Sequence, residues 1–277
     1  MHRTRKSPFI RYFDKTPPGI VCPHFFILAH ANGCPYDCSY CYLTLTFRQK
    51  KCEAFTNLAD MEREVACWIE NTQTPSVLNA GELADSVAVD FAWFAPIYGL
   101  FAKQTRHVLL LLTKSTASEL ERWEPNPSVI VGFSVNAADV SAQYERGAPP
   151  SMERLAAAER LKRRGWRVRL RLEPMLPAPN WQTAYQPALQ RIGEIGPERL
   201  TVGSLRYFPA LRRRHKGFPL IRVERDGADG RMRVTRSLRL EMYQFVRSHL
   251  PFPFGLCKET ADLHATFNPL PHCNCTI

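Results

Sequence analysis

The chain has 277 residues, 45% of them hydrophobic, and its 37 Lys and Arg against 26 Asp and Glu give a formal net charge of +11. This length and composition allow one large domain, or two small ones, with a sizeable core. No apolar stretch approaches the roughly 18 residues that a membrane helix needs, and no apolar segment follows the basic N-terminus. These observations exclude a membrane protein and make us expect a cytoplasmic one.

Strand and helix patterns alternate along the chain. Residues 1–21 are a basic arm without clear periodicity, and an apolar run then predicts a first buried strand. The predicted strands are 25–29, 76–79, 108–112, 129–133, 166–172 and 200–205, and the predicted helices are one capped by Asn57, 87–103, a short one near Glu119, 151–164, which Gly165 ends, and 181–195. Six alternations indicate a parallel sheet with helices packed outside.

Residues whose side chains can take part in catalysis or ligand binding follow these strands. In parallel α/β barrels, function gathers at the carboxyl ends of the strands. The groups at those ends are the loop 31–43, Gly81 with Glu82, Lys114, Ser134 with Asn136, Glu173, and Arg206. We therefore expect these side chains to meet at one edge of the sheet.

The loop after the first strand carries three cysteines, Cys34, Cys38 and Cys41, in a C-x3-C-x2-C arrangement. Soft thiolates select zinc, copper or iron–sulfur clusters. Three thiolates on a [4Fe–4S] cluster leave one iron open, which is a catalytic arrangement. Alternatively, His30 could complete a zinc site, although no second Cys/His pair follows before Cys52. The nine cysteines gather at two places, which favours metal binding in a reducing compartment over a disulfide framework.

With Tyr40 as the aromatic residue, the spacing C-x3-C-x-aromatic-C resembles the signature of radical SAM enzymes. The longer string 29–42 is similar to the spore photoproduct lyase branch, and the resemblance covers most of 22–207. It implies an α/β fold with a partial TIM-type barrel of six β/α units. It also implies a [4Fe–4S] cluster on the three cysteines, whose open iron binds S-adenosylmethionine and reduces it to a 5′-deoxyadenosyl radical. The electron donor would be a protein such as flavodoxin or ferredoxin.

The same resemblance implies roles for the strand-end residues. Gly81 and Glu82 occupy the place of a motif that holds the methionine amino group, and Lys114 would hold the carboxylate. With residues added from the strand ends and the strand 167–173, the predicted cofactor-binding set is Gly81, Glu82, Asp85, Lys114, Ser134, Asn136 and Glu173, and the predicted catalytic set is Tyr40, Tyr42, Glu82, Arg171 and Arg206. The plain alternatives are a strand-end turn at Gly81, a snorkelling lysine at Lys114 and aromatic packing of the tyrosines.

One residue departs from the family pattern. The photoproduct lyases keep a cysteine that returns a hydrogen atom to the repaired thymine, and Glu82 stands at that position here. A carboxylate cannot replace the thiol, because its O–H bond is too strong. Either the reaction differs or another residue donates, and the nearest candidates in sequence are Tyr40, Tyr42, Cys52 and Cys67.

The strand 167–173 alternates strictly between charged and aliphatic residues. Because side chains alternate faces, the aliphatic set should meet the helices while Arg167, Arg169, Arg171 and Glu173 face the barrel interior. Buried charges need partners or a ligand. Arg171 and Glu173, nearest the mouth, are therefore predicted to contact substrate or cofactor, whereas Arg167 could simply be exposed.

Beyond Arg206 the pattern changes to a basic extension. Segments 221–225 and 231–235 predict a β-hairpin, and Ser237 is a candidate cap for a last helix ending near 249. The basic residues are Arg206, Arg212, Arg213, Arg214, His215, Lys216, Arg222, Arg225, Arg231, Arg233 and Arg236. Arginines suit phosphate contacts, and Tyr207, Phe208 and Phe218 could stack on bases. A solvated charged face is the alternative.

The tail carries Cys257, Cys273 and Cys275. They could hold a second iron–sulfur cluster or, with His264 or His272, a zinc ion. An unstructured tail is the alternative.

We predict an arm (1–21), a barrel (22–207) and an extension (208–277) with a basic hairpin and a cysteine-containing tail. The favoured function is radical SAM chemistry on damaged DNA, with pyrimidine-dimer reversal as the specific reaction. The alternatives are a radical SAM enzyme acting on a peptide, RNA or small metabolite, and a non-catalytic zinc-bearing nucleic-acid-binding protein. Salt-sensitive binding of DNA would favour the first.

Overall fold

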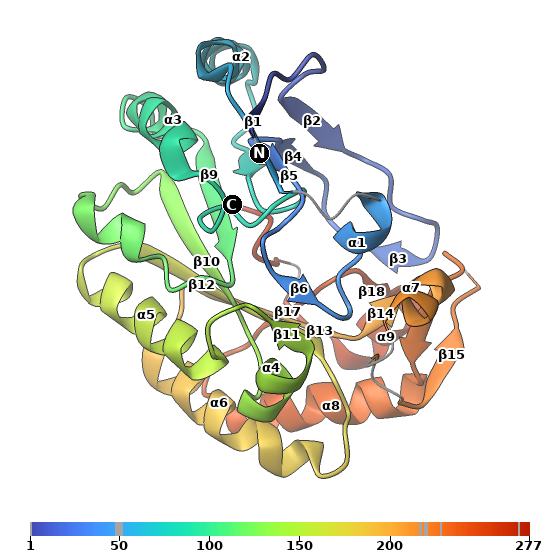
Figure 1. The fold of residues 1–277 in the computed structure, drawn as a ribbon. Coiled ribbons are helices and arrows are strands. Elements are labelled where there is room, and N and C mark those ends of the chain that lie inside the picture. Colours follow the sequence, from blue (N-terminus) through green and yellow to red (C-terminus); the bar gives the residue numbers. More distant parts are fainter. Residues whose placement is uncertain (1, 48–51, 216–217, 219–220, 228, 271) are drawn as a thin grey trace.

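One curved sheet of eight strands organises the protein in the computed structural model, which describes residues 2–47, 52–215, 218, 221–227, 229–270 and 272–277 (Figure 1). In spatial order the strands are β17 (Gly255–Leu256), β13 (Arg199–Ser204), β12 (Arg167–Met175), β10 (Val129–Val135), β9 (Val108–Thr113), β8 (Val77–Asn79), β4 (Phe25–Leu28) and β2 (Ile10–Phe13). Neighbours from β4 to β17 are parallel, and β2 is antiparallel to β4. The predicted parallel sheet and partial barrel are confirmed.

Helices surround the outer face of the sheet (Figure 1). They are α2 (Leu58–Asn71), α3 (Phe94–Phe101), α5 (Ser151–Arg163), α6 (Trp181–Ile195) and α8 (Arg236–His249). Because both faces of the central strands are covered, β10 is buried at every position. The crossover between β9 and β10 contains only the 3₁₀ helix η2 (Ser118–Arg122).

Several helices begin at other residues than predicted, and side-chain hydrogen bonds account for part of the difference. The helix expected from residue 87 begins only with η1 (Phe91–Trp93) and α3, because Asp85 Oδ1 accepts the N–H groups of Val87 and Ala88 and holds them in a turn. Asn57 does precede α2, but its side chain makes no capping bond and binds the backbone of Arg5 instead. The helix predicted to follow Ser237 is α8, which follows Thr235 instead, and the helix α9 (Ala261–Phe267) beyond it was not predicted.

The sheet continues across both predicted domain boundaries. At one edge, β2 comes from the arm, and β17 at the other edge comes from the extension. The arm also contributes β1 (His2–Arg3) to a small sheet with β7 (Glu53–Phe55) and β5 (Ala31–Asn32). The division into three units remains a prediction.

The extension contains the predicted hairpin. Strands β15 (Val223–Arg225) and β16 (Met232–Val234) are antiparallel, and β14 (Arg206–Tyr207) adds a third strand beside β16. The remaining elements of the extension are α7 (Pro209–Arg214), β18 (Glu259–Thr260), which pairs with β3 (Ile20–Val21), and α9 (Ala261–Phe267). No described helix is both long and apolar enough to cross a membrane.

The C-terminal tail is ordered and runs along the inner side of the sheet (Figure 1). Asn274 is buried, and its side chain donates to the Leu170 carbonyl at 3.0 Å and accepts from Thr201 Oγ1 at 2.8 Å. Arg169, also buried, donates to the Asn274 carbonyl at 2.8 Å and pairs with Glu198. The alternative of an unstructured tail is therefore wrong. Polar side chains of β12 and β13 therefore pair with the tail.

Candidate active site

The cysteine loop is fixed by backbone pairing. Strand β6 (Asp37–Cys38) is antiparallel to β11 (Glu145–Arg146), with Cys38 opposite Glu145. Gly33 has a φ of +78°, which favours glycine, and its N–H donates to the Leu83 carbonyl at 2.9 Å. These contacts hold the loop over the carboxyl ends of the strands.

The three loop thiols lie within electrostatic range of one another. Cys38 is buried, and Cys34 and Cys41 are partly exposed. Burial raises the pKa of Cys38 to about 12, so a metal would have to displace its proton. Among the described residues, no three histidine, cysteine or acidic side chains lie close enough to share a single metal ion. The three cysteines supply soft thiolate donors of the kind that hold an iron–sulfur cluster.

His30 does not complete a zinc site. Its ring stacks on Trp93, with centroids 4.5 Å apart, and burial lowers its pKa to about 3. The histidine is therefore a neutral core residue beside the loop.

A buried ion pair supports the loop from behind. Glu145, at the end of helix α4 (Ala138–Tyr144), pairs with Arg154 of α5 and accepts a hydrogen bond from the Tyr40 hydroxyl. Arg154 also donates to the carbonyl of Ser134. Burial alone would raise the pKa of Glu145, but Lys114 and Arg154 hold it below its ordinary value. The charged pair thereby joins the cysteine loop to β10.

Lys114 stands between the loop and β10. Its Nζ donates to Ser134 Oγ at 3.0 Å and lies 5.8 Å from the centroid of the Tyr40 ring. Burial alone would lower its pKa, but Glu145 and the Cys38 thiol raise it above its ordinary value. The side chain is thus a charged donor aimed at the loop, with the Glu145 carboxylate as the anionic neighbour expected for a half-buried lysine.

Asp85 and Gly81 shape the turn after β8. The Asp85 carboxylate accepts from Thr113 Oγ1 at 2.6 Å and from the Lys114 N–H at 2.7 Å, in addition to the turn N–H groups. A Cβ on Gly81 would lie 2.4 Å from Leu112 Cβ, so glycine is required for close approach to β9. Both residues therefore position the strand end that carries Lys114.

The side chain of Asn136 also makes hydrogen bonds inside the protein. Its side chain donates to the Pro174 carbonyl at 2.9 Å and accepts from the Tyr185 hydroxyl at 2.6 Å. It is completely buried. These contacts set the path of β12 beside β10.

Tyr42 and Glu82 meet at the mouth of the barrel. Tyr42 is 45% exposed, and its hydroxyl donates to the Glu82 carbonyl. Of the other predicted hydrogen donors, Tyr40 is bound to Glu145, Cys52 lies 3.6 Å from the Gly33 carbonyl, and Cys67 is exposed on α2. Tyr42 is thus the predicted donor that stands beside Glu82.

Arg171, Glu173 and Arg206 form one ionic cluster whose side chains are only 10–13% exposed. Both arginines pair with the Glu173 carboxylate. Burial alone would raise the pKa of Glu173, but the two arginines hold it well below its ordinary value. Gly203 leaves room for the group, because a Cβ there would lie 3.0 Å from Glu173 Cγ. The alternation predicted for this strand is confirmed, and Arg171 and Glu173 do face inward.

Comparison with known proteins identifies the family. A family model described as spore photoproduct lyase matches residues 15–209. The chain belongs to the spore photoproduct lyase family. It is therefore a radical SAM lyase, and the non-catalytic zinc-binding alternative is set aside.

Solved structures agree with this family. A spore photoproduct lyase complexed with dinucleoside spore photoproduct has a TM-score of 0.74 at 18% identity, covering 93% of this chain and 81% of that one. A double mutant of spore photoproduct lyase with bound AdoMet and the same dinucleoside has a TM-score of 0.69 at 19% identity, covering 86% and 76%. Streptococcus suis SuiB bound to S-adenosylmethionine has a TM-score of 0.56 at 11% identity, covering 87% and 51%. No curated protein sequence matches this chain.

Several basic and aromatic residues in the extension of this lyase are less able to contact nucleic acid than the sequence indicated. Arg206 and Arg233 are held by internal ion pairs, and Arg231 lies 4.7 Å from the Phe208 ring. Tyr207 and Phe218 are buried, so of the three aromatic residues only Phe208 is exposed for stacking. The exposed basic residues are Arg212, Arg213, Arg214, Arg222, Arg225 and Arg236, and Lys216 lies outside the described residues.

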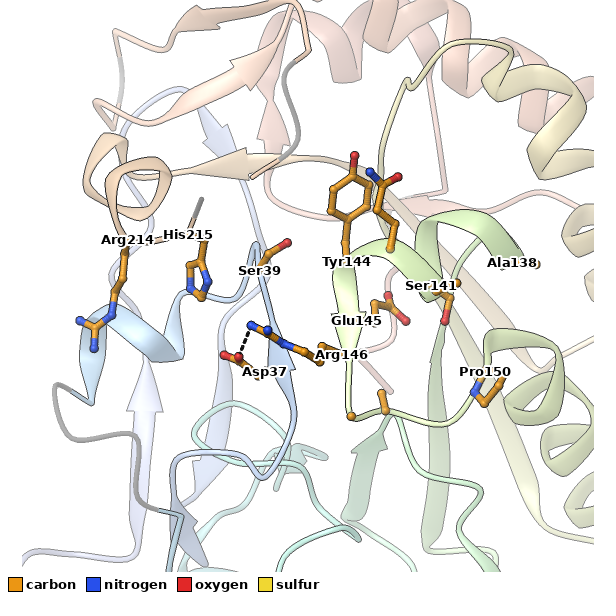
Figure 2. A pocket seen from close by; sticks show the side chains of 14 residues that line it. Asp37, Ser39, Ala138, Ser141, Tyr144, Glu145, Arg146, Pro150, Arg214 and His215 are labelled. Carbon is orange, nitrogen blue, oxygen red and sulfur yellow. Dashed lines mark hydrogen bonds and ion pairs between the residues drawn. The ribbon is translucent and has the colours of Figure 1, made fainter. Parts of the chain in front are cut away.

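A cavity of about 600 Å³ adjoins the outer side of the cysteine loop (Figure 2). Asp37 and Ser39 of the loop, Glu145 and Arg146 of β11, and His215 line parts of it, and Asp37 pairs with Arg146 across one side. None of the residues predicted to bind the cofactor lines this cavity. The residues predicted to bind the cofactor lie instead around Lys114 and the cluster of Arg171, Glu173 and Arg206.

Sequence reasoning missed Glu145 and Arg154. Arg154 does leave a signal, because it falls on the apolar stripe of α5 with Ser151, Leu155, Ala158 and Leu161. A charged residue on a buried stripe requires a partner. Glu145 has no comparable local signal, since it follows a short helix that the sequence did not predict.

Proposed function

We propose that this lyase holds a [4Fe–4S] cluster on Cys34, Cys38 and Cys41, binds S-adenosylmethionine beside it, and acts on damaged DNA, with pyrimidine-dimer reversal as the reaction. When bound, the cluster and cofactor supply a 5′-deoxyadenosyl radical that abstracts hydrogen from the substrate. The observation that carries the proposal is the set of three converging loop thiols with a charged lysine beside them.

The protein's own contribution is orientation and charge. Lys114 has three donors, of which one is used on Ser134, so it can still bind the carboxylate of the cofactor. Glu82 lies across the mouth and can accept from the cofactor's ammonium group. Tyr40 is held by Glu145 and forms a rigid wall beside Lys114. These residues would hold the cofactor between the loop and β8.

The surface near the loop supports nucleic acid as the substrate class. Helix α7 packs against α1 (Leu43–Thr46), which follows the cysteine loop directly, and Thr44 Oγ1 lies 3.3 Å from His215 Nε2. The last turn of α7 presents Arg212, Arg213 and Arg214 to solvent. Exposed arginines beside the mouth suit phosphate contacts. The dinucleoside photoproduct in the related lyase structures supports the same substrate class.

A radical SAM reaction on a different substrate is the second candidate. The observation in its favour is Glu82, which stands where the lyases keep a hydrogen-donating cysteine. Tyr42 beside it could donate in a modified photoproduct reaction. The two candidates differ in whether irradiated DNA is changed.

The test is mass spectrometry of irradiated DNA after anaerobic incubation with the enzyme, S-adenosylmethionine and dithionite. We expect loss of the photoproduct and recovery of unmodified pyrimidines. Release of 5′-deoxyadenosine with unchanged DNA would contradict the DNA substrate while leaving radical chemistry intact. Tyr42→Phe in deuterated buffer should change the deuterium recovered in the product if Tyr42 donates.

Measuring DNA affinity tests the proposed binding surface on α7 independently of the radical reaction. Replacing Arg212, Arg213 and Arg214 with Gln should weaken DNA binding and reduce its salt dependence by up to about three charges. Arg160→Gln on the outer helix α5 is the matched control, since Arg160 is also exposed. Equal affinities for both variants would contradict this binding surface.

A further inference from the structure

Four thiols gather inside the barrel, separate from the three of the cysteine loop. Cys22 follows β3, Cys257 follows β17, and Cys273 and Cys275 lie in the tail. Cys22 packs against the small cluster formed by Phe25, Cys273 and Cys275 and lies within electrostatic range of Cys257, and Cys273 also lies within range of Cys257. Cys22 is partly buried, and the other three are buried.

Backbone contacts bring these segments together. Strand β3 is antiparallel to β18, with Val21 opposite Glu259, which places Cys22 beside the segment of Cys257. The Cys257 N–H donates to the Val202 carbonyl at 2.9 Å. A Cβ on Gly255 would lie 2.1 Å from the His272 carbonyl oxygen, so the tail lies directly against β17. The cluster of thiols is therefore set by the fold and not by flexible side chains.

The sulfur atoms are surrounded by donors. Arg171 Nη2 lies 2.9 Å from Cys257 Sγ, and Arg206 Nη2 lies 3.4 Å from the same atom. Asn79 Nδ2 lies 3.8 Å from Cys275 Sγ. A neutral thiol is a weak acceptor, whereas cationic donors stabilise a thiolate. Hydrogen bonds to sulfur are also a common feature around iron–sulfur clusters.

Ordinary core packing does not account for this group. Buried free cysteines behave as small hydrophobic residues and need no cationic neighbours. Here Phe13, Phe25 and Ile27 do pack against the tail cysteines. In addition, the guanidinium groups of Arg171 and Arg206 lie against Cys257, and the Asn79 amide lies against Cys275.

We propose that Cys22, Cys257, Cys273 and Cys275 hold a second iron–sulfur cluster inside the barrel. Four cysteine thiolates are the usual ligands of such clusters. His264 and His272 are not needed, because Cys22 supplies the fourth ligand that the tail lacks. The cluster would lie next to Arg171 and Glu173, and the proposal does not depend on which substrate the enzyme uses.

The experiment removes the loop cluster first. A variant with Cys34→Ala, Cys38→Ala and Cys41→Ala is reconstituted anaerobically with iron and sulfide, and both are quantified. We expect it to stay brown and to keep about half the iron and sulfide of the unaltered protein. Adding Cys273→Ser and Cys275→Ser should remove the remainder, whereas adding Cys67→Ser, an exposed cysteine on α2, should not.

Other outcomes are equally informative. A colourless loop variant, or one with stoichiometric zinc and no sulfide, overturns the second cluster. A loop variant that keeps all its iron overturns the loop cluster and leaves the second one standing. Cys273→Ser with Cys275→Ser in the unaltered loop should lose about half the iron but keep an electron paramagnetic resonance signal that changes on addition of S-adenosylmethionine. Full iron content in that variant also overturns the proposal.

Discussion

The Tyr40 hydroxyl donates a hydrogen bond to Glu145, and this contact joins the cysteine loop to a charge pair buried behind it. Tyr40 lies between Cys38 and Cys41 in sequence, so its position fixes both thiols. Glu145 in turn draws Lys114 toward the loop by charge. The geometry of the proposed cofactor site therefore depends on a residue that contacts neither cluster nor substrate.

Breaking the Glu145–Arg154 pair should strongly destabilise the protein. Arg154→Met leaves the Glu145 carboxylate buried without its ion-pair partner, so we expect the free energy of unfolding to fall by about 3–5 kcal/mol. Arg160→Met, on the same helix but exposed, should cost less than about 1 kcal/mol. Urea denaturation of both variants measures the difference, and similar midpoints would contradict the structural role of the pair.

The two tyrosines of the loop should behave differently. Tyr40→Phe removes a buried donor from Glu145, and we expect a loss of about 1–3 kcal/mol in the free energy of unfolding. Tyr42→Phe removes the hydrogen bond to the Glu82 carbonyl from a side chain that is 45% exposed, so it should cost no more than about 1 kcal/mol. Thermal unfolding of the two proteins is the measurement. A larger loss of unfolding free energy for Tyr42→Phe would mean that the contact between Tyr42 and Glu82, and not the contact between Tyr40 and Glu145, stabilises the loop.

The pH dependence of the free energy of unfolding should show the contribution of the Glu145 carboxylate. Its pKa is lowered in the folded state, so its contribution is present above the ordinary value of 4.5 and is lost as the pH falls through the folded value. The stability difference between the unaltered protein and Glu145→Gln should therefore shrink as the pH falls below about 4.5. Urea unfolding across that range tests this. A difference that stays constant with pH would mean that Glu145 is not held as a charged group.

The sequence predicts the barrel because hydrophobic periodicity is local. Strands such as β9 and β10 are continuous apolar runs, and the cysteine loop has fixed spacing. The support for the site could not be predicted in the same way, since Glu145 and Cys22 act through residues far away in the chain. Cys22 has no other cysteine near it in the sequence, and the pairing of β3 with β18 brings it to the cysteines of the extension. The aromatic residues Tyr207 and Phe218 were wrong as stacking candidates because the extension folds back and buries them.

Gly81 should tolerate no side chain. Gly81→Ala puts a Cβ 2.4 Å from Leu112 Cβ, which must separate the ends of β8 and β9, and we expect a loss of about 1–3 kcal/mol. Gly99→Ala is the control, because nothing lies within 4 Å of that added Cβ, and in helix α3 it should stabilise by about 0.5–1 kcal/mol. The two shifts in unfolding free energy should have opposite signs. Equal shifts would contradict the close approach at Gly81.

The most direct measurement is the yield of 5′-deoxyadenosine after anaerobic reconstitution with iron and sulfide and reduction in the presence of S-adenosylmethionine. The account predicts a brown protein that releases the nucleoside, and a Cys38→Ala variant that releases none, while Cys67→Ser, an exposed cysteine on α2, matches the unaltered protein. An equal yield from Cys38→Ala and the unaltered protein, or no yield from either, would contradict it.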